Sequence, residues 1–325
     1  MDFLLKIEAQ LRKKKIVLDR SSLRELPSKG FMSEVYCADS NKGMLIIHIL
    51  TPVAEQRIQG TMQKIEAVAK LLERHPEIPA ARVYCQGTLA RNKSFSVQSL
   101  IEGKPMGKRI VVNGEIADTY YPSQKNRLPQ VLRAIARIHS INVKGFGYFD
   151  PLKKGFAGRY VSWQEFLRKE SRRWIAVALA HTGKKSVRER AFLEKLRSFL
   201  PRMLKKYDAA LAVASPRLIH GDMVNPGNIL VKDSHISGII DFEWALAGDP
   251  AWEFAFTQDV ALTAYFQERR RHGPVDEDSF FLRMRIYALF WLLWGVTVHA
   301  NGGPVKKILL RMLRARFDAF EKNEM

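Results

Sequence analysis

Before residue 104 the chain contains short stretches in which apolar and polar residues alternate. Four of them have the β-branched and aromatic composition of strands: SEVYCADS (33–40), MLIIHIL (44–50), RVYCQGTL (82–89) and KSFSVQSLIEG (93–103). The DSNKG segment (39–43) predicts a hairpin turn. Residues 53–75 instead carry apolar side chains at positions 58, 62, 65, 68, 69, 71 and 72, a helical spacing that Pro76 and Pro79 end. This part therefore predicts a small antiparallel sheet with one helix.

The pattern changes after Gly103, where most long stretches have the spacing of helices. The helix-like stretches are residues 128–141, 162–179, 188–211, 286–298 and 304–322. The sequence shows no internal repeat and no low-complexity linker. We therefore expect an α+β protein with two lobes, in which residues 1–102 form the small sheet lobe and residues 103–325 form a larger, mainly helical lobe.

Composition is typical of a folded protein with a sizeable core: 46% of the 325 residues are hydrophobic and 26% are charged. The two cysteines, Cys37 and Cys85, lie far apart, which argues against a disulfide or zinc framework and fits a reducing compartment. The longest apolar stretch, Ile286 to Val298, is too short to span a bilayer and predicts a buried helix. The first residues do not resemble a signal peptide. We therefore expect a cytoplasmic protein with no membrane partner.

The net charge of +20 is unevenly distributed along the chain. Residues 151–206 hold 16 Lys and Arg against 4 Asp and Glu, or +12. Such a field attracts anions and repels polycations. The basic residues are not interleaved with aromatic ones, and no nucleic-acid-binding motif is present, so we expect no nucleic acid partner. The charge fits either a solvated helical surface or an anionic small substrate.

Residues 218–231 read LIHGDMVNPGNILV, a loop rich in glycine and amides between two strand-like runs. Asp222 lies in this loop, and Asp241 follows the apolar run SGII, so a hairpin between them would bring both carboxylates together with Asn228. Mg²⁺ prefers oxygen ligands, commonly one or two carboxylates with phosphate oxygens and water. Phosphoryl transfer also requires a carboxylate that orients the acceptor hydroxyl. The pattern therefore indicates magnesium-dependent phosphoryl transfer.

This loop, together with IIDFEWALAGDPAWEFA (239–255), resembles the aminoglycoside phosphotransferase and choline kinase family, whose members are small-molecule relatives of the protein kinases. Further segments resemble the family in order along the chain: KGFMSEVYCA (29–38), KIEAVAKLLERHPEIPAARV (64–83), QSLIEGKPMG (98–107), VLRAIARIHSI (131–141) and GFGYFD (145–150). The resemblance covers nearly the whole chain. It implies a protein-kinase-like two-lobed fold, with ATP or GTP as the phosphate donor and Mg²⁺ as the cofactor.

The resemblance also implies roles for individual residues. Asp222 matches the catalytic aspartate that orients the acceptor hydroxyl or receives its proton, and His220 matches a histidine that is usually structural. Asp241 matches the main magnesium ligand, and Asn228 matches a second one. Glu66 matches the helix glutamate that normally pairs with a strand lysine. The remaining nucleotide-binding positions are Gly30 and Ser33 in the phosphate-covering loop and Gln98, Ser99, Leu100 and Ile101 in the hinge that meets the adenine.

The catalytic loop departs from the family in its length. The family usually has four residues between the loop aspartate and asparagine, whereas Met223 to Gly227 are five. Either the loop bulges, or Asn225 supplies the amide in place of Asn228. We favour Asn228, because it directly precedes the strand-like run ILV.

A second departure concerns the cation that positions the phosphates. The family places Lys or Arg in the strand that MLIIHIL resembles, and the polar residue there is His48. Strand alternation puts His48 on one face with Ile46. If His48 replaces the cation, the Glu66 carboxylate and the phosphates should raise its pKa. Lys29 is the alternative cation.

We therefore expect a phosphotransferase that moves the γ-phosphate of ATP or GTP to a hydroxyl of a small molecule, such as an antibiotic or a sugar-like or nucleoside-like metabolite. A nucleotide-binding pseudokinase and a basic interaction protein are the alternatives. The basic helical segment favours a neutral or anionic acceptor over a polycation. Glu243 and Asp249 could be structural or could face the acceptor. The spacing of Trp291 and Trp294 favours the core, although both could instead contact the acceptor. The oligomeric state stays open.

Overall fold

The computed structural model describes residues 2–26, 33–50, 61–90, 93–112, 115–150, 156–183, 186–255 and 262–324. Gly30 and Lys29 lie outside these ranges. The chain divides into two compact units, and the first contains residues 1–106, 150–156 and 228–245. The second unit contains residues 107–149, 157–227 and 246–325.

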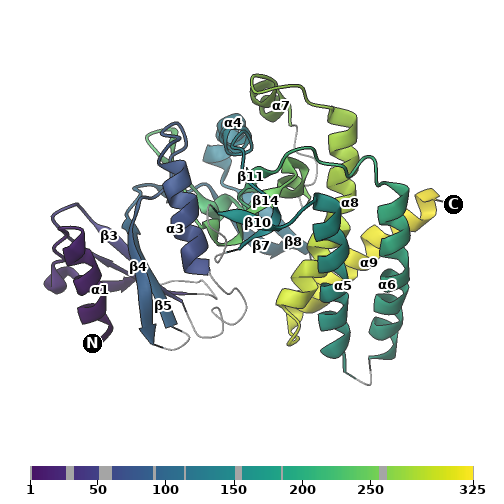
Figure 1. Cartoon of the computed structure of the whole chain (residues 1–325), viewed down its shortest axis with the longest axis horizontal. Helices are drawn as coiled ribbons and strands as arrows, with labels where there is room; N and C mark the ends of the chain where they lie inside the picture. The colour runs from purple at the N-terminus through teal and green to yellow at the C-terminus, as the bar shows by residue number, and fades with distance from the viewer. Residues whose placement is uncertain are drawn as a thin grey trace. The chain divides into compact units, whose positions relative to one another are not determined.

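The main sheet of the first unit is antiparallel. Its strands are β1 (Arg24–Leu26), β2 (Ser33–Ala38), β3 (Leu45–Leu50), β4 (Val83–Ala90) and β5 (Lys93–Ser99), in the order β1-β2-β3-β5-β4. Figure 1 labels β3, β4 and β5. Helix α1 (Asp2–Lys13), which the sequence pattern did not predict, buries Ile7 and Leu11 against Ile47 of this sheet. Helix α3 (Thr61–Leu72) packs against β4 and β5. The predicted antiparallel sheet with a helix is thus confirmed.

A second, smaller sheet also belongs to the first unit. It contains β6 (Lys104–Pro105), β12 (Ile229–Lys232) and β13 (His235–Ile239), in the order β13-β12-β6. Asp233 and Ser234 join β12 to β13 with φ angles of 48° and 69°, which suits the right-handed twist of a two-residue hairpin. The Ile239 N–H donates to the Pro79 carbonyl oxygen at 2.7 Å. Long-range strand pairing therefore places residues 228–245 with the first unit, although they follow residue 103 in sequence.

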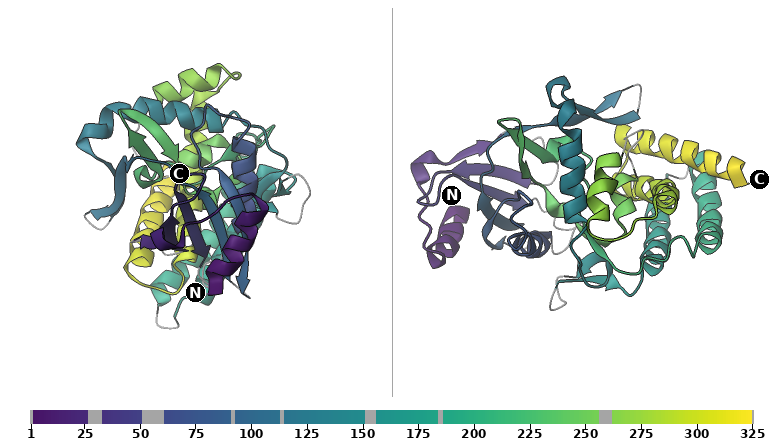
Figure 2. Two further views of the ribbon diagram at one scale, coloured as in Figure 1. Left: turned by 90° about the vertical axis from the view of Figure 1, so that its left-hand side faces the viewer. Right: turned by 90° about the horizontal axis from the view of Figure 1, so that it is seen from above.

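The second unit is mainly helical. Its helices are α4 (Leu128–Ile138), α5 (Trp163–Ala180), α6 (Val187–Lys206), α7 (Thr263–Arg270), α8 (Glu277–Val298) and α9 (Pro304–Glu324). Helices α5 and α6 lie side by side in the views of Figures 1 and 2. Trp163, Trp252 and Tyr287 meet in a buried aromatic cluster, which ties α5 to α8. By length and composition α8 could cross a membrane, but half of its most apolar window is buried, as expected of a core helix.

Short strands frame the catalytic loop within the second unit. They are β9 (Phe146–Asp150), β10 (Ala157–Tyr160), β11 (Arg217–Ile219) and β14 (Leu246–Gly248), in the order β10-β9-β14-β11. Strand β11 leads directly into the loop. A separate hairpin of β7 (Gly107–Val112) and β8 (Glu115–Tyr120) lies in a part of the chain where the sequence pattern suggested only helices.

Candidate active site

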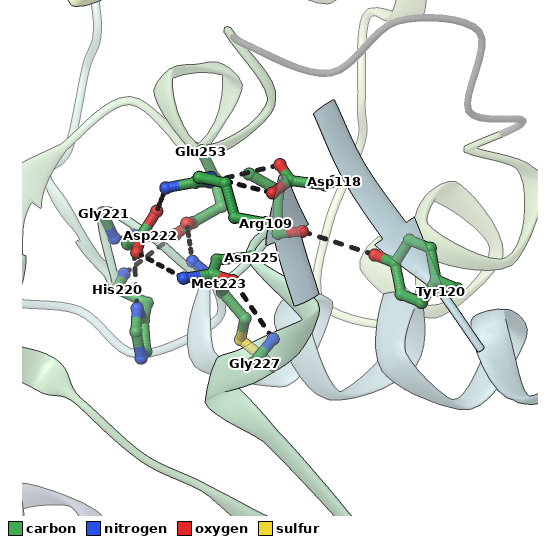
Figure 3. Close-up of polar contacts among 11 residues, drawn as sticks. Arg109, Asp118, Tyr120, His220, Gly221, Asp222, Met223, Asn225, Gly227 and Glu253 are labelled. Carbon is green, nitrogen blue, oxygen red and sulfur yellow. Dashed lines mark hydrogen bonds and ion pairs between the residues drawn. The ribbon is translucent and has the colours of Figure 1, made fainter. Parts of the chain in front are cut away.

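The Asp222 carboxylate is held through both of its oxygen atoms (Figure 3). Oδ1 accepts a hydrogen bond from Arg109 Nη1 at 2.8 Å, and Oδ2 accepts one from Asn225 Nδ2 at 3.2 Å. Asn225 Oδ1 in turn accepts from the Gly227 N–H at 3.1 Å. A carboxylate fixed at both oxygens has a defined direction, which a group that orients a substrate hydroxyl requires.

The backbone of the catalytic loop is bound by one buried carboxylate. Glu253 Oε2 accepts from the N–H groups of His220 and Gly221 at 2.9 and 3.0 Å, and Oε1 accepts from the Met223 N–H at 2.8 Å. Glu253 lies in the short 3₁₀-helix Pro250–Phe254 that follows β14. Three charge-assisted hydrogen bonds therefore hold the loop on either side of Asp222.

Glu253 is ionised in this environment, and its neighbour His139 is neutral. Burial opposes the Glu253 charge, but His139, His220 and the Met223 N–H outweigh that effect and lower the pKa of Glu253. Burial lowers the pKa of His139 as well. His139 Nε2 lies 3.6 Å from Glu253 Oε2, and its Nδ1 lies 2.9 Å from the Tyr265 hydroxyl. The sequence did not reveal that Glu253 binds the loop, because its hydrogen-bond partners lie about thirty residues earlier in the chain.

Replacing Glu253 with glutamine should destabilise the protein by about 1–3 kcal/mol, because an amide N–H₂ would face a backbone donor that is left unsatisfied. The pKa of Glu253 is lowered from its ordinary value of 4.5. The stability that its charge contributes is therefore present above pH 4.5 and is lost as the pH falls through the lowered value. Urea unfolding at pH 7 and at lower pH measures both effects. Glu194→Gln, on the exposed surface of α6, is the control and should change stability little.

Arg109 contacts Asp222 and Asp118, and the sequence analysis singled out neither Arg109 nor Asp118. They face each other across the β7–β8 hairpin and form two bonds, from Nε to Oδ1 at 2.8 Å and from Nη2 to Oδ2 at 3.1 Å. The Asn113-Gly114 dipeptide is a hairpin signal that could have revealed β7 and β8. No local signal links Arg109 to Asp222, from which it is 113 positions distant.

In the first unit, the β12–β13 hairpin brings the two expected metal ligands together. Ile229 pairs with Ile239, and the Ile240 N–H donates to the Asn228 carbonyl oxygen at 3.0 Å. Asn228 directly precedes β12, and Asp241 comes two residues after the end of β13, so both lie at the same end of the hairpin. Asp241 has the left-handed backbone angles φ 70° and ψ 55°, a conformation that costs a residue other than glycine about 1–3 kcal/mol and is concentrated at functional sites.

The oxygen donors at this end of the hairpin suit magnesium. Asp241 offers a carboxylate and Asn228 a side-chain amide, both of which are hard ligands. Among the described residues, no group of three or more His, Cys, Asp and Glu forms a complete metal cage. Mg²⁺ commonly takes one or two protein carboxylates and completes its shell with phosphate oxygens and water, so the residues present fit this ion.

His48 does not pair with Glu66, as it would if it replaced the family's cation. His48 Nε2 lies 2.7 Å from Gln98 Nε2, which donates to it, so the imidazole is neutral. Glu66 accepts from the Gln86 amide and forms an ion pair with Lys70 at 2.7 Å. Burial lowers the pKa of His48 to about 4. The expected rise in this pKa is therefore wrong for the protein without nucleotide, because burial acts on His48 and the carboxylate is engaged elsewhere.

A polar layer extends from His48 across the main sheet. Strand register places His48 opposite Ser96, and Ser96 opposite Gln86. Ser96 Oγ and Gln86 Oε1 are buried and have no hydrogen-bond partner among the described residues. His48, Ser96 and Gln86 are neutral, whereas the family resemblance implies a cation in the strand that contains His48.

Neutral His48 predicts a specific dependence of stability on pH. Its folded pKa of about 4 lies below the ordinary 6.5, so its contribution is complete above pH 6.5 and is lost as the pH falls from 6.5 towards 4. His48→Gln should reduce the loss of unfolding free energy between pH 7 and pH 5 by about 1–2 kcal/mol. Urea unfolding at the two pH values tests this expectation. The exposed His235→Gln is the control, and an equal effect in both variants would contradict it.

The expected hinge is partly engaged in the main sheet. The N–H groups of Ser99 and Leu100 donate to the carbonyl oxygens of Arg82 and Met44 at 2.9 and 3.0 Å. Within the described part of the chain, Ile101 is the first hinge residue after them whose N–H makes no hydrogen bond. Ser33, from the phosphate-covering segment, begins β2.

The residues considered for the acceptor lie in different surroundings. The Glu243 carbonyl oxygen accepts a hydrogen bond from Lys64 of α3. The rings of Trp291 and Trp294 are in edge-to-face contact, 5.7 Å apart on α8, and both are partly buried. Asp249, which could also have faced the acceptor, is buried against Arg283 and the Tyr287 hydroxyl, both at 2.6 Å. Asp249 is therefore structural.

Comparisons with known proteins identify the family and the fold of this chain. The model of the phosphotransferase enzyme family matches residues 34–283. Solved structures with a similar fold include a thermostable mutant of the aminoglycoside phosphotransferase APH(4)-Ia, with a TM-score of 0.63 and 18% identity over 96% of this chain and 98% of that one. The same enzyme has been solved with ADP and hygromycin B. A search of curated proteins gave no match.

Two further solved structures have the same fold. The macrolide 2'-phosphotransferase MphH from Brachybacterium faecium has a TM-score of 0.56 and 14% identity, over 96% of this chain and 98% of that one. A putative fructosamine-3-kinase from Haemophilus somnus has a TM-score of 0.57 and 15% identity, over 94% and 96%. At these identities the similarity shows the fold and not the acceptor.

Proposed function

The chain belongs to the phosphotransferase enzyme family, and on that premise we propose that it transfers the γ-phosphoryl group of ATP or GTP to a hydroxyl of a small molecule. The observation that carries the proposal is the Asp222 carboxylate, which is fixed by Arg109 and Asn225 on a loop bound by Glu253. In phosphoryl transfer, positioning and electrostatic stabilisation account for most of the catalysis. A rigidly held carboxylate beside the acceptor hydroxyl supplies the positioning.

Asp222 would act on the acceptor. The acceptor oxygen forms a bond to the γ-phosphorus while the bond between that phosphorus and the β-phosphate oxygen breaks. The hydroxyl proton passes to the Asp222 carboxylate, and the nucleoside diphosphate leaves. Asn228 and Asp241 would hold Mg²⁺, which when bound neutralises charge on the phosphates. Asn225 holds Asp222 and the Gly227 N–H, and Asn228 directly precedes β12, so we assign the metal amide to Asn228.

The remaining nucleotide contacts are assigned by family resemblance and by what the first unit offers. Ser33 and Gly30 would cover the phosphates. Glu66 and His48 would border the phosphate side, and the hinge from Gln98 to Ile101 would meet the adenine, with the Ile101 N–H as the available donor.

The acceptor is proposed to be neutral or anionic. Residues 151–206 carry +12, and this field repels a polycation. Glu243, Trp291 and Trp294 are the proposed acceptor contacts, since aromatic rings pack well against sugar faces. The ADP complex of APH(4)-Ia supports a nucleotide donor, while its antibiotic does not by itself define the acceptor of this chain. A cytoplasmic location also stays a prediction.

A transfer assay tests the proposal. The protein is incubated with γ-labelled ATP or GTP, with Mg²⁺ or with chelator, and with neutral, anionic and polycationic hydroxylated compounds. We expect magnesium-dependent transfer to a neutral or anionic compound. Nucleotide binding without transfer to any compound would favour the pseudokinase alternative, and fast transfer to polycations alone would contradict the charge argument.

A further inference from the structure

The β7–β8 hairpin is built against the catalytic loop. Among the described strands, β7 and β8 pair only with each other, and an isolated two-stranded hairpin is marginally stable in water. The Tyr120 hydroxyl lies 3.5 Å from the Val224 carbonyl oxygen (Figure 3). A Cβ atom added at Gly107 would lie 2.1 Å from the Thr119 carbonyl oxygen of β8 and 2.9 Å from Pro226 Cγ, so glycine allows β7 to approach both its partner strand and the loop closely. The hairpin therefore gains support from the loop that carries Asp222.

Arg109 is held rigidly by this hairpin. Its guanidinium donates two parallel hydrogen bonds to Asp118. A third hydrogen bond, of 2.8 Å, runs from Nη1 to Asp222 Oδ1. The planar guanidinium fork matches a carboxylate in two-bond geometry, which a lysine cannot reproduce. Side chains alternate along a strand, and Lys108 is exposed while Arg109 is directed towards the loop. Strand β7 therefore directs Arg109 towards Asp222 and Lys108 towards solvent.

The charges explain why the arginine is needed. The side chains of Arg109, Asp118 and Asp222 are 26%, 15% and 14% exposed, so solvent screens them weakly. One positive and two negative charges leave a net −1. Burial disfavours the Arg109 charge, but Asp222 and Asp118 raise the pKa of Arg109, so the cation persists. Burial raises the pKa of Asp118, and its proximity to Asp222 adds to this. Without Arg109 the carboxylates would repel each other.

We propose that Arg109 is a positioning residue for phosphoryl transfer: it fixes the direction of the Asp222 carboxylate, and Asp118 fixes Arg109. The inference rests on the proposed function of Asp222. Arg109 binds Oδ1 and Asn225 binds Oδ2, so loss of Arg109 removes the hydrogen bond that fixes Oδ1. Arg109 acts through Asp222 and not on the nucleotide, so its loss should lower kcat and leave the KM for nucleotide unchanged.

Substitutions on the hairpin test the proposal. Arg109→Met should lower kcat by about 10–100-fold, because small misplacements of a reacting geometry cost that much. Arg109→Lys should recover part of the rate, and Asp118→Asn should lower kcat by less than Arg109→Met does. Lys108→Met removes the same charge from the exposed neighbour and should leave kcat unchanged. Circular dichroism and thermal unfolding establish that each variant is folded.

Two further measurements separate positioning from simple structural damage. Methylguanidinium added to Arg109→Ala should restore part of kcat and should leave the rate of Lys108→Met unchanged. In an Asp222→Asn background, Arg109→Met should lower the residual rate no further, because the residue through which Arg109 acts is already lost.

The possible failures are distinct. Folded Arg109→Met that transfers phosphate with the wild-type kcat would overturn the role of Arg109 while leaving the proposed function intact. A nucleotide KM that rises in step with the fall in kcat would also overturn it, because Arg109 would then contact the nucleotide. A wild-type chain that transfers phosphate to no compound would overturn the proposed function and this inference together.

Discussion

Replacing Asp222 with asparagine is expected to lower kcat for phosphoryl transfer by about 10²–10⁴-fold, the usual contribution of a positioned general base. Asparagine keeps the volume, and its single carbonyl oxygen can still accept a hydrogen bond from Arg109 or from Asn225, so the loop should stay folded. It cannot take the hydroxyl proton. Nucleotide affinity should be unchanged, because in the proposed mechanism Asp222 acts on the acceptor.

Transfer kinetics and calorimetric titration with ATP measure the two expectations separately. Asp208→Asn makes the same chemical change at an exposed position beyond α6 and is the control. A transfer rate of Asp222→Asn within a few-fold of the wild type would exclude Asp222 as the catalytic carboxylate. A large loss of nucleotide affinity would instead assign Asp222 to the donor site.

The second large effect concerns Asp241. Asp241→Asn should abolish the magnesium-dependent gain in ATP affinity, because the carboxylate is the charged ligand of the proposed site. Even partners that only support metal ligands change metal affinity or activity by about 10–100-fold when removed, and a direct ligand should cost at least as much. Asparagine is the appropriate replacement, since it tolerates the left-handed backbone of Asp241 better than alanine does.

The same hairpin offers a closely matched control for this substitution. Asp233 also has a positive φ, of 48°, and lies in the turn at the other end of β12 and β13. Asp233→Asn should leave magnesium-dependent binding intact. If Mg²⁺ strengthens ATP binding equally in Asp241→Asn and in the wild type, Asp241 is not the metal ligand.

Much of the fold followed from local patterns. The strands around residues 33–50 and 82–99 and the helices α3, α4, α5, α6, α8 and α9 agree with the spacing of apolar residues. The hairpin that joins Asn228 and Asp241 could also be predicted, because both positions flank strand-like runs a short distance apart. Helices α1 and α7, strands β9, β10 and β14 and the β7–β8 hairpin were missed, because their patterns are short or mixed and tertiary packing stabilises them.

The sequence by itself determined the residues that can carry chemistry, because their types and close spacing are properties of the local chain: Asp222 in a glycine-rich loop, and Asn228 and Asp241 on either side of one hairpin. Tertiary structure alone decided how they are held. Arg109 and Glu253 reach the catalytic loop from distant positions, and burial makes His48 a neutral acceptor where proximity to charge had suggested a cation. Long-range contacts and desolvation depend on which segments pack together, and no local periodicity records that packing.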